Sequence, residues 1–196
     1  MMISDKAIMV FLIGMLALGA QAASFDCAKA SSLVEKVICA ESRLSELDQQ
    51  LAISYKETLA NVADVDSLKA GQLAWLKSRN QCQESTCLVS AYQRRIKELD
   101  HYTEKITGVL ISGGGIDDMA LSIRAANGRT VHAYCNRHCS DDWFVADRDE
   151  VYSLIRKFIN RPVSVTVARQ HNKSRIAGPG DDDVLSFITT LGFPGK

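Results

Sequence analysis

The sequence has little proline, and the first of its three prolines is Pro162. Proline inside a helix removes a backbone hydrogen bond and clashes with the preceding turn. The long stretch before Pro162 therefore contains no proline to interrupt its helices. Long apolar runs are also missing after residue 22. A membrane-spanning helix needs about 20 such residues, so we expect no membrane anchor in residues 23–196.

An excess of basic residues is missing too. Lys and Arg together number 23, and so do Asp and Glu. Residues 24–104 carry ten basic and twelve acidic side chains, and residues 105–196 carry twelve basic and ten acidic ones. A protein that binds the phosphate backbone usually concentrates Lys and Arg on one part of the chain. We therefore expect no nucleic-acid partner.

Signatures of catalysis and of cofactor binding are absent as well. The sequence has no Gly-x-Ser-x-Gly, P-loop or dinucleotide-binding motif, and no nucleophile motif surrounds any of its four histidines. The adjacent carboxylates at Asp141–Asp142 and at Asp181–Asp183 lack the alternating spacing of a calcium loop. We predict that the protein is not an enzyme, with no catalytic residues, no bound cofactor and no metal site.

Residues 1–22, MMISDKAIMVFLIGMLALGAQA, have the pattern of a secretory signal peptide. Lys6 precedes the apolar run Ala7–Ala20, and Ala20-Gln21-Ala22 fits the small-x-small cleavage rule. An uncleaved membrane anchor is the alternative, but the run is short for one. No cysteine stands at the cleavage point to carry a lipid. We expect an exported protein, periplasmic or secreted, of a bacterial envelope.

All six cysteines lie after residue 22, and an even number in an exported chain indicates disulfides. Six cysteines allow 15 pairings. Local spacing suggests Cys27–Cys39, Cys82–Cys87 and Cys135–Cys139. The alternatives are metal or redox chemistry. Cys82 and Cys87 lack the second ligand pair of a zinc site and the Cys-x-x-Cys spacing of a redox pair. For Cys135 and Cys139, with His138 between them, both alternatives stay open.

Residues 23–103 have the periodicity of a small helical domain. Ser32 followed by Glu35 matches a capping box at the start of a short first helix. Apolar residues then recur every three or four positions in two stripes and in a third helix that ends near Arg79: Leu44, Leu47, Leu51, Tyr55 and Leu59; Leu88, Tyr92, Ile96 and Leu99; Val65, Leu68, Trp75 and Leu76. So small a core commonly needs disulfides.

Residues 104–196 have a different pattern, that of a small, mostly β domain. Asn127-Gly128 predicts a type I′ hairpin turn, and residues 147–160 have helical spacing. The expected strands are 106–112, 119–126, 129–135, 162–168 and 183–191. This β-β-β-α-β-β order resembles that of the OB fold, a five-stranded barrel. Another small α+β sandwich is the alternative. The predicted class is therefore α+β, with two domains.

The helical part also carries a family pattern. FDCAKASSLVEKVICAESRLSELDQQLAISY, then AWLKSRNQC, then CLVSAYQRRIKEL resembles the LprI-like lysozyme-inhibitor N-terminal domain family of exported bacterial proteins, over residues 24–102. The matching positions are Phe25, Asp26, Cys27, Glu35–Cys39, Leu44, Leu47, Asp48, Trp75, Arg79, Cys82, Cys87, Tyr92, Arg95, Ile96 and Leu99. The resemblance implies mostly structural roles: Trp75 and Tyr92 fill helix contacts, and Arg79 caps carbonyls or pairs with an acid such as Asp48.

The resemblance further implies a protein partner, a lysozyme or a related cell-wall lytic enzyme. Such enzymes are basic, so an acidic helical face is expected to steer them, with ordinary solvated charges as the alternative. That face comprises Glu41, Glu46, Asp48, Glu57, Asp64 and Asp66. The alternative function is an envelope interaction or stress module. It would bind a protein or glycan through the second domain, in a groove beside Tyr134, Trp143 and Phe144.

Overall fold

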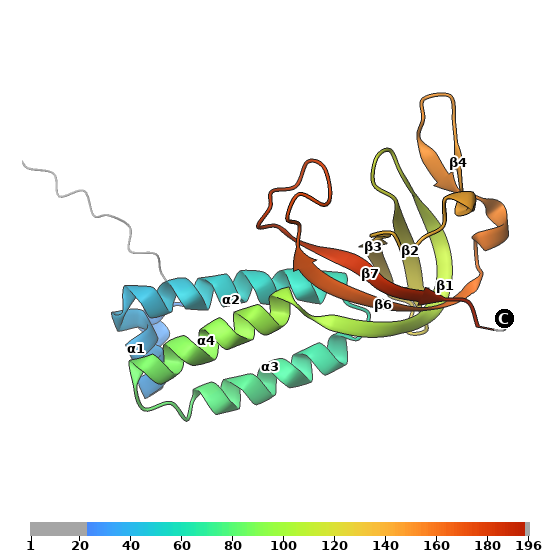
Figure 1. Ribbon diagram of the computed structural model, residues 1–196. Coiled ribbons are helices and arrows are strands. Elements are labelled where there is room, and N and C mark those ends of the chain that lie inside the picture. The colour runs from blue at the N-terminus through green and yellow to red at the C-terminus, as the bar shows by residue number, and fades with distance from the viewer. Residues whose placement is uncertain (1–22, 195–196) are drawn as a thin grey trace, which may run out of the picture.

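The computed structural model describes residues 23–194, so the predicted signal peptide lies outside the described residues. Four α-helices come first and seven strands follow, at opposite ends of an elongated molecule (Figure 1). Each part has its own cluster of buried apolar side chains, one among the helices and one among the strands. The predicted α+β class with two parts agrees with this arrangement.

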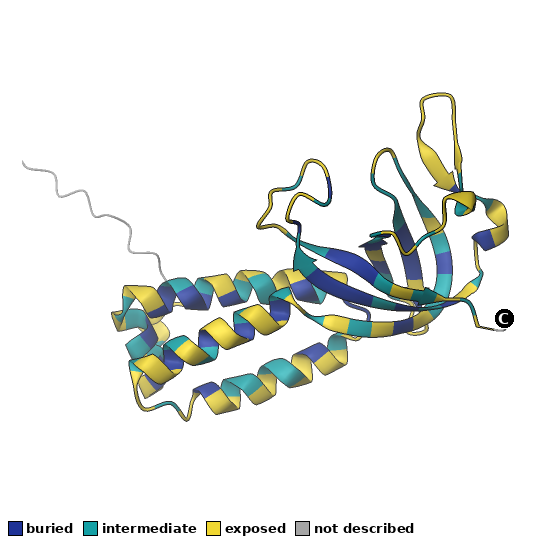
Figure 2. Cartoon of the chain, viewed as in Figure 1, coloured by how far each residue is buried: buried dark blue, intermediate teal, exposed yellow. Residues whose placement is uncertain are grey.

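The helical part contains the helices that the periodicity predicts. They are the 3-10 turn η1 (Cys27–Lys29), α1 (Leu33–Ala40), α2 (Ser42–Asn61), α3 (Val65–Arg79) and α4 (Ser85–Asp100). Leu44, Leu47 and Leu51 of α2 are buried, as are Leu88, Tyr92 and Leu99 of α4. Helix α3 buries only Leu68 and Arg79, and most of its surface is exposed (Figure 2). The core of this part therefore lies mainly between α2 and α4.

The predicted capping box opens α1. The Ser32 hydroxyl accepts a hydrogen bond from the Glu35 backbone N–H at 3.1 Å. The Glu35 carboxylate accepts from the backbone N–H groups of Ser32 and Ser31, at 2.9 and 2.8 Å. These two backbone donors lower the pKa of Glu35 from 4.5 to about 2. Both ends of the motif thus satisfy N–H groups that a helix start leaves unpaired.

This lowered pKa gives a pH dependence that can be measured. Because the Glu35 pKa is lower in the folded protein, its stabilising contribution is complete above about pH 4.5 and is lost as the pH falls through about 2. We expect the stability difference between the wild type and Glu35→Gln to shrink over that interval. Urea unfolding at several pH values measures it. A constant difference from pH 5 to pH 2 would contradict the assignment.

The three disulfides are Cys27–Cys39, Cys82–Cys87 and Cys135–Cys139, the pairings expected from local spacing. The first joins η1 to α1, the second closes the turn between α3 and α4, and the third closes a turn after strand β3 (Thr130–Tyr134). No cysteine of the described chain is free. The sulfurs of Cys135 and Cys139 are therefore bonded to each other and are not free thiolates.

The strands form one sheet that returns on itself. They are β1 (Thr103–Gly115), β2 (Ala120–Ala125), β3, β4 (Phe144–Ala146), β5 (Tyr152–Leu154), β6 (Pro162–His171) and β7 (Val184–Gly192). Pairings run from β1 to β2, β3, β7 and β6 and back to β1. Alternate residues such as Leu110, Val165 and Ile188 are fully buried among these strands. The link between β3 and β7 is parallel and consists of one residue pair, Tyr134 with Phe187.

The helix predicted over residues 147–160 is wrong. Those residues instead complete the β4–β5 hairpin and add a 3-10 turn, η3 (Arg156–Phe158). The Asp147 carboxylate accepts hydrogen bonds from the backbone N–H groups of Asp149 and Val151, at 2.9 and 3.0 Å. Aspartate competes with helix formation in this way. Strand β5 then pairs with β1, so the described chain has seven strands where five were expected.

The hairpin predicted between β2 and β3 is present, but its turn is not type I′. A type I′ turn needs positive φ at two consecutive residues. In this turn only Gly128 has it, at +87°, and its N–H donates to the Ala125 carbonyl at 2.9 Å. The Asn127 side chain donates to the Ala63 carbonyl at 2.9 Å instead. The Asn127 side chain of this turn therefore contacts the helical part.

Three side chains of the strand part hold the link between α2 and α3, and we call them the clasp: Glu104, Asn127 and Arg129. Arg129 donates to the carbonyls of Val62 and Leu59, both at 2.9 Å, where α2 ends. The Glu104 carboxylate accepts from the backbone N–H groups of Ala63 and Asp64, at 2.8 and 3.1 Å. A cation at a helix C-terminus is favourable. The clasp therefore joins the two parts through backbone groups that helix ends leave unpaired.

Replacing Arg129 with methionine is expected to lower the free energy of unfolding by about 2 kcal/mol, because two carbonyls of α2 lose a charged donor. Equilibrium urea unfolding measures the loss. Arg124→Met is the matched control, since Arg124 is exposed on β2 and its side chain has no hydrogen bond or ion pair with any described residue. The control should stay within about 0.5 kcal/mol of the wild type. Equal losses in both variants would show that the clasp does not stabilise the fold.

Candidate functional site

A buried polar network lies at the centre of the helical part. The Tyr92 hydroxyl on α4 donates to Asp48 Oδ1 on α2 at 2.7 Å, and Arg79 Nη1 at the end of α3 donates to the Tyr92 oxygen at 2.9 Å. Trp75 meets the Tyr92 ring edge to face, with centroids 5.2 Å apart. The network therefore connects three helices. Arg79 reaches Asp48 through Tyr92, whereas the resemblance implied that Arg79 caps carbonyls or pairs directly with an acid such as Asp48.

The N-terminal segment also ends on this network. Ser24 donates to Asp48 Oδ2 from its backbone N–H at 2.8 Å and from its hydroxyl at 2.5 Å. Asp48 is only 5% exposed, and both of its carboxylate oxygens are hydrogen-bonded. Burial, and then the bond to Asp48, raise the pKa of Tyr92, so its phenol stays neutral well above neutral pH. Asp48 is thus a buried acceptor that joins α2 to α4 and to the N-terminal segment.

A pocket of about 320 Å³ opens beside the network. The N-terminal segment contributes Phe25, α2 contributes Tyr55, and α3 contributes Gln72 and Trp75. The Trp75 indole N–H donates to the Ala91 carbonyl at 3.2 Å, which holds the ring in place. The pocket therefore combines aromatic rings, one of them fixed by a hydrogen bond, with hydrogen-bonding groups. That combination suits contact with a protein partner.

The remaining family positions are also structural. Asp26 accepts a hydrogen bond from the Ala28 backbone N–H at 3.0 Å and caps η1, while Phe25 packs against the helical core. Arg95 on α4 donates to Gln72 at 3.0 Å and pairs with Glu98 at 3.1 Å. All of these contacts lie within the helical part, and the structural role that the resemblance implies for these positions stays a prediction.

The predicted acidic face is not a single open surface. Asp48 is buried, so its inclusion was wrong. Three of the other acids have partners within the fold: Glu41 accepts from the Ser85 hydroxyl, Glu57 pairs with Arg169, and Asp64 caps α3 through the Ser67 N–H. Glu46 makes a long, exposed pair with Arg43, and Asp66 is exposed on α3. Glu46 and Asp66 are therefore the acids of this set best placed to meet a partner.

The sequence predicted one groove beside Tyr134, Trp143 and Phe144. In the structure these three residues have different neighbours. Tyr134 on β3 lies 6.0 Å, centroid to centroid, from Phe187 and lines a cavity near the end of α2. Trp143 packs against Phe158 and Phe193, each at 5.3 Å. Phe144 lines a separate cavity of about 690 Å³ among the loops. These surroundings do not form one common groove.

Three further findings bear on what the chain can bind. Within residues 23–194, no cluster of three or more His, Cys, Asp or Glu side chains has the arrangement of a metal site. No helix in that range is both long enough and apolar enough to cross a membrane. His132, one of the four histidines, is bonded through Nδ1 to the Ser122 hydroxyl at 2.8 Å.

Comparison with known proteins gives a match for the helical part. Residues 27–99 match the family model described as lysozyme inhibitor LprI. The proteins named lipoprotein LprI from Mycobacterium bovis and from Mycobacterium tuberculosis are 32% identical to this chain over 80 residues. The aligned segment is 39% of this chain and 40% of those relatives, so well under half of either is compared. No solved structure shows a significant match.

The match includes both disulfides of the helical part and the network of Asp48, Arg79 and Tyr92. It ends at residue 99, before β1 begins at Thr103. Residues 27–99 are therefore similar to the family described as lysozyme inhibitor LprI, and the match does not cover the strand part that follows.

Proposed function

We propose that this chain is an exported, non-catalytic binding protein whose helical domain binds and inhibits a lysozyme or a related cell-wall lytic enzyme. The observation that carries the proposal is the match of residues 27–99 to a family described as lysozyme inhibitors. A periplasmic or secreted location is supported by the three disulfides and by the relatives' description as lipoproteins.

The binding surface that we infer is the pocket beside Trp75, and two exposed acids elsewhere on the helical domain would steer the partner toward that domain. Phe25, Tyr55 and Trp75 supply aromatic contact area. Trp75 is held by its contacts with Ala91 and Tyr92, and Phe25 follows Ser24, which is bonded to Asp48. Residues anchored in this way lose little conformational freedom when a partner binds. Glu46 on α2 and Asp66 on α3 would attract a basic enzyme before contact.

The experiment uses the purified protein without residues 1–22 at micromolar concentration. Lysis of a bacterial cell-wall substrate measures inhibition, and calorimetry measures binding. We expect a slower lysis rate and a saturable heat of binding. An unchanged lysis rate together with no heat of binding would reject the proposal.

A charge-reversal pair tests the surface. Glu46→Lys/Asp66→Lys should slow association about tenfold at low salt, because a basic partner is repelled. Asp142→Lys/Asp149→Lys is the control, since it changes the net charge equally at exposed positions of the strand part. Equal effects of the two variants would assign the steering to total charge rather than to the helical surface.

We also propose that residues 23–103 and 104–196 are separate domains and that the second is OB-like. The ring of pairings supports this, because with the β4–β5 hairpin set aside its strands follow the OB order. The hairpin and η3 take the place of the helix that joins the third and fourth strands of that fold. The β1 strand begins at Thr103, one residue before the proposed boundary.

A second candidate function is that this strand domain binds a protein or glycan partner. The cavity of about 690 Å³ favours it, because three loops converge there with Asp118, Arg137, Phe144 and Arg175. Asn136, Arg137, Lys173 and Ser174 all have positive φ, a strained geometry that is often retained at binding loops. Glycan-array binding of the full protein tests it. Phe144→Ala should remove the signal, and Arg156→Ala, outside the cavity, should not.

A further inference from the structure

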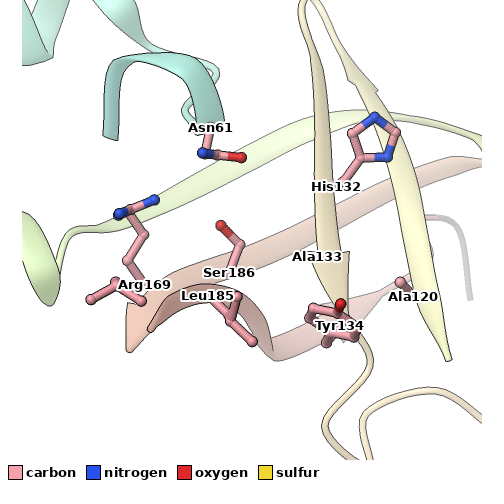
Figure 3. Close-up of a pocket in the computed structure, with 9 residues that line it drawn as sticks. Asn61, Ala120, His132, Ala133, Tyr134, Arg169, Leu185 and Ser186 are labelled. Carbon is pink, nitrogen blue, oxygen red and sulfur yellow. The ribbon is translucent and has the colours of Figure 1, made fainter. Parts of the chain in front are cut away.

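A different cavity lies where the strand ring meets the end of α2. Its volume is about 260 Å³, and Figure 3 shows its lining side chains. Asn61 comes from α2, His132 and Tyr134 come from β3, and Arg169 and Ser186 come from β6 and β7. Strands β3 and β7 pair only at Tyr134 and Phe187. The cavity lies beside this short link.

Arg169 is the unusual member of this lining. Its side chain is only 3% exposed, yet its one ion pair is a single contact of 3.3 Å between Nη2 and Glu57. Its Nε is buried and has no hydrogen-bond partner among the described residues. The structure gives Nη1 no partner within that part of the chain either. A buried donor without a partner is unfavourable, so this guanidinium has capacity for another acceptor.

Other donors with no partner line the same cavity. The hydroxyls of Ser186 and Tyr134 make no hydrogen bond with any described residue, and Figure 3 shows both side chains among those that line the cavity. His132 uses Nδ1 toward Ser122, which leaves its Nε2 without a partner in the described chain. The remaining lining is small or apolar, with Ala120, Ala133, Val184 and Leu185.

The positive charge of the cavity comes from Arg169, with the carboxylates of Glu57 and Asp100 near it. Among the described lining residues, Arg169 is the only one that stays charged at all working pH values. Burial lowers its pKa, while Glu57 and Asp100 oppose that shift. The Glu57 side chain is 53% exposed, so much of its charge is screened by water. An acceptor inside the cavity would meet the guanidinium with less screening.

We propose that this cavity binds a small molecule that carries a carboxylate or a phosphate group. Its oxyanion accepts hydrogen bonds from Arg169 and from the hydroxyls of Ser186 and Tyr134, and its apolar part rests on Ala133 and Leu185. The volume is below the range of about 300–1,000 Å³ typical of drug-sized ligands, so the ligand is compact. This site is independent of the helical surface proposed above.

The test follows backbone amide shifts of the full protein by NMR during titration with acetate, glucuronate or inorganic phosphate. Sodium chloride at matched ionic strength is the reference. We expect saturable shifts at Tyr134 and Ser186, with dissociation constants in the millimolar range, and the stronger probe identifies carboxylate or phosphate as the preferred group. If all three probes shift these amides no more than chloride does, the site does not exist.

Three variants assign the binding to the cavity. Tyr134→Phe keeps the ring against Phe187 and removes one donor, so affinity should fall about tenfold. Glu57→Gln removes the competing carboxylate, and affinity should rise severalfold. Tyr152→Phe, on the exposed β5 strand, is the matched control and should change nothing. Equal affinities in all three variants would overturn the proposal. None of these variants changes Arg169, whose substitution could unfold the protein.

Discussion

Replacing Asp48 with alanine is expected to lower the free energy of unfolding by about 4 kcal/mol, a large part of the stability of a small domain. Asp48 is buried, and its two oxygens accept hydrogen bonds from Tyr92 and Ser24. Removing one member of a buried charged network typically costs about 3–5 kcal/mol, because its partners stay buried without an acceptor. Arg79 would lose its indirect counter-charge as well. Equilibrium urea unfolding measures the change.

Two comparisons separate the network from general effects of mutation. Glu46→Ala, also on α2 but half exposed, should change the stability by no more than about 0.5 kcal/mol. Tyr92→Phe should cost about 2 kcal/mol, and the double variant with Asp48→Ala should cost less than the sum of the two single changes. Strictly additive losses would show that Asp48 and Tyr92 do not act together.

Loss of both disulfides of the helical domain is expected to destabilise that domain by about 5 kcal/mol. The loop-entropy model assigns about 3 kcal/mol to Cys27–Cys39 and about 2 kcal/mol to Cys82–Cys87. A domain of this size typically has only about 5–15 kcal/mol in total. The variant with all four cysteines replaced by serine should therefore be close to unfolding at about 37 °C. Its helical circular dichroism signal should melt far below that of the wild type.

The disulfide assignment has its own controls. A reductant acting on the wild type should reproduce the four-serine variant, whereas a metal chelator should leave the melting curve unchanged. The Cys135→Ser/Cys139→Ser variant should keep the helical signal, because that disulfide closes a turn of the strand part. Melting that responds to the chelator, or free thiols in the unreduced protein, would contradict the three disulfides.

The Asp48 network and the two disulfides also bear on function, because they make the helical domain rigid. The network and the disulfides hold Phe25 and Trp75 in place, and the proposed partner surface depends on those positions. A variant that loosens the helical domain should therefore weaken partner binding before it abolishes folding. The cavity at Arg169 takes Asn61 from α2 and its other lining residues from the strand part, so its anion binding reports on the strands and the end of α2 together.

The helices could be predicted from the sequence because their signals are local. The apolar stripe through Leu44, Leu47 and Leu51 repeats with the helical period, and Ser32 with Glu35 forms a cap within one turn. Cysteine pairs separated by 4, 5 and 12 positions likewise favour nearest-neighbour disulfides. Strand positions also followed from alternation, since β1, β2, β6 and β7 lie close to the expected ranges.

Only the tertiary structure decided the features that depend on residues far apart in the chain. Residues 147–160 have helical spacing, but the Asp147 turn and the pairing of β5 with β1 produce a hairpin. The sequence placed Asp48 on an acidic face and, through the resemblance, beside Arg79, whereas the structure buries it and bonds it to Tyr92, 44 positions later. Arg129 caps a helix that ends about 70 positions earlier, and the Arg169 cavity combines segments from α2 to β7. Periodicity describes which side of an element is apolar, whereas these contacts depend on which elements meet, and that is set when the two cores pack.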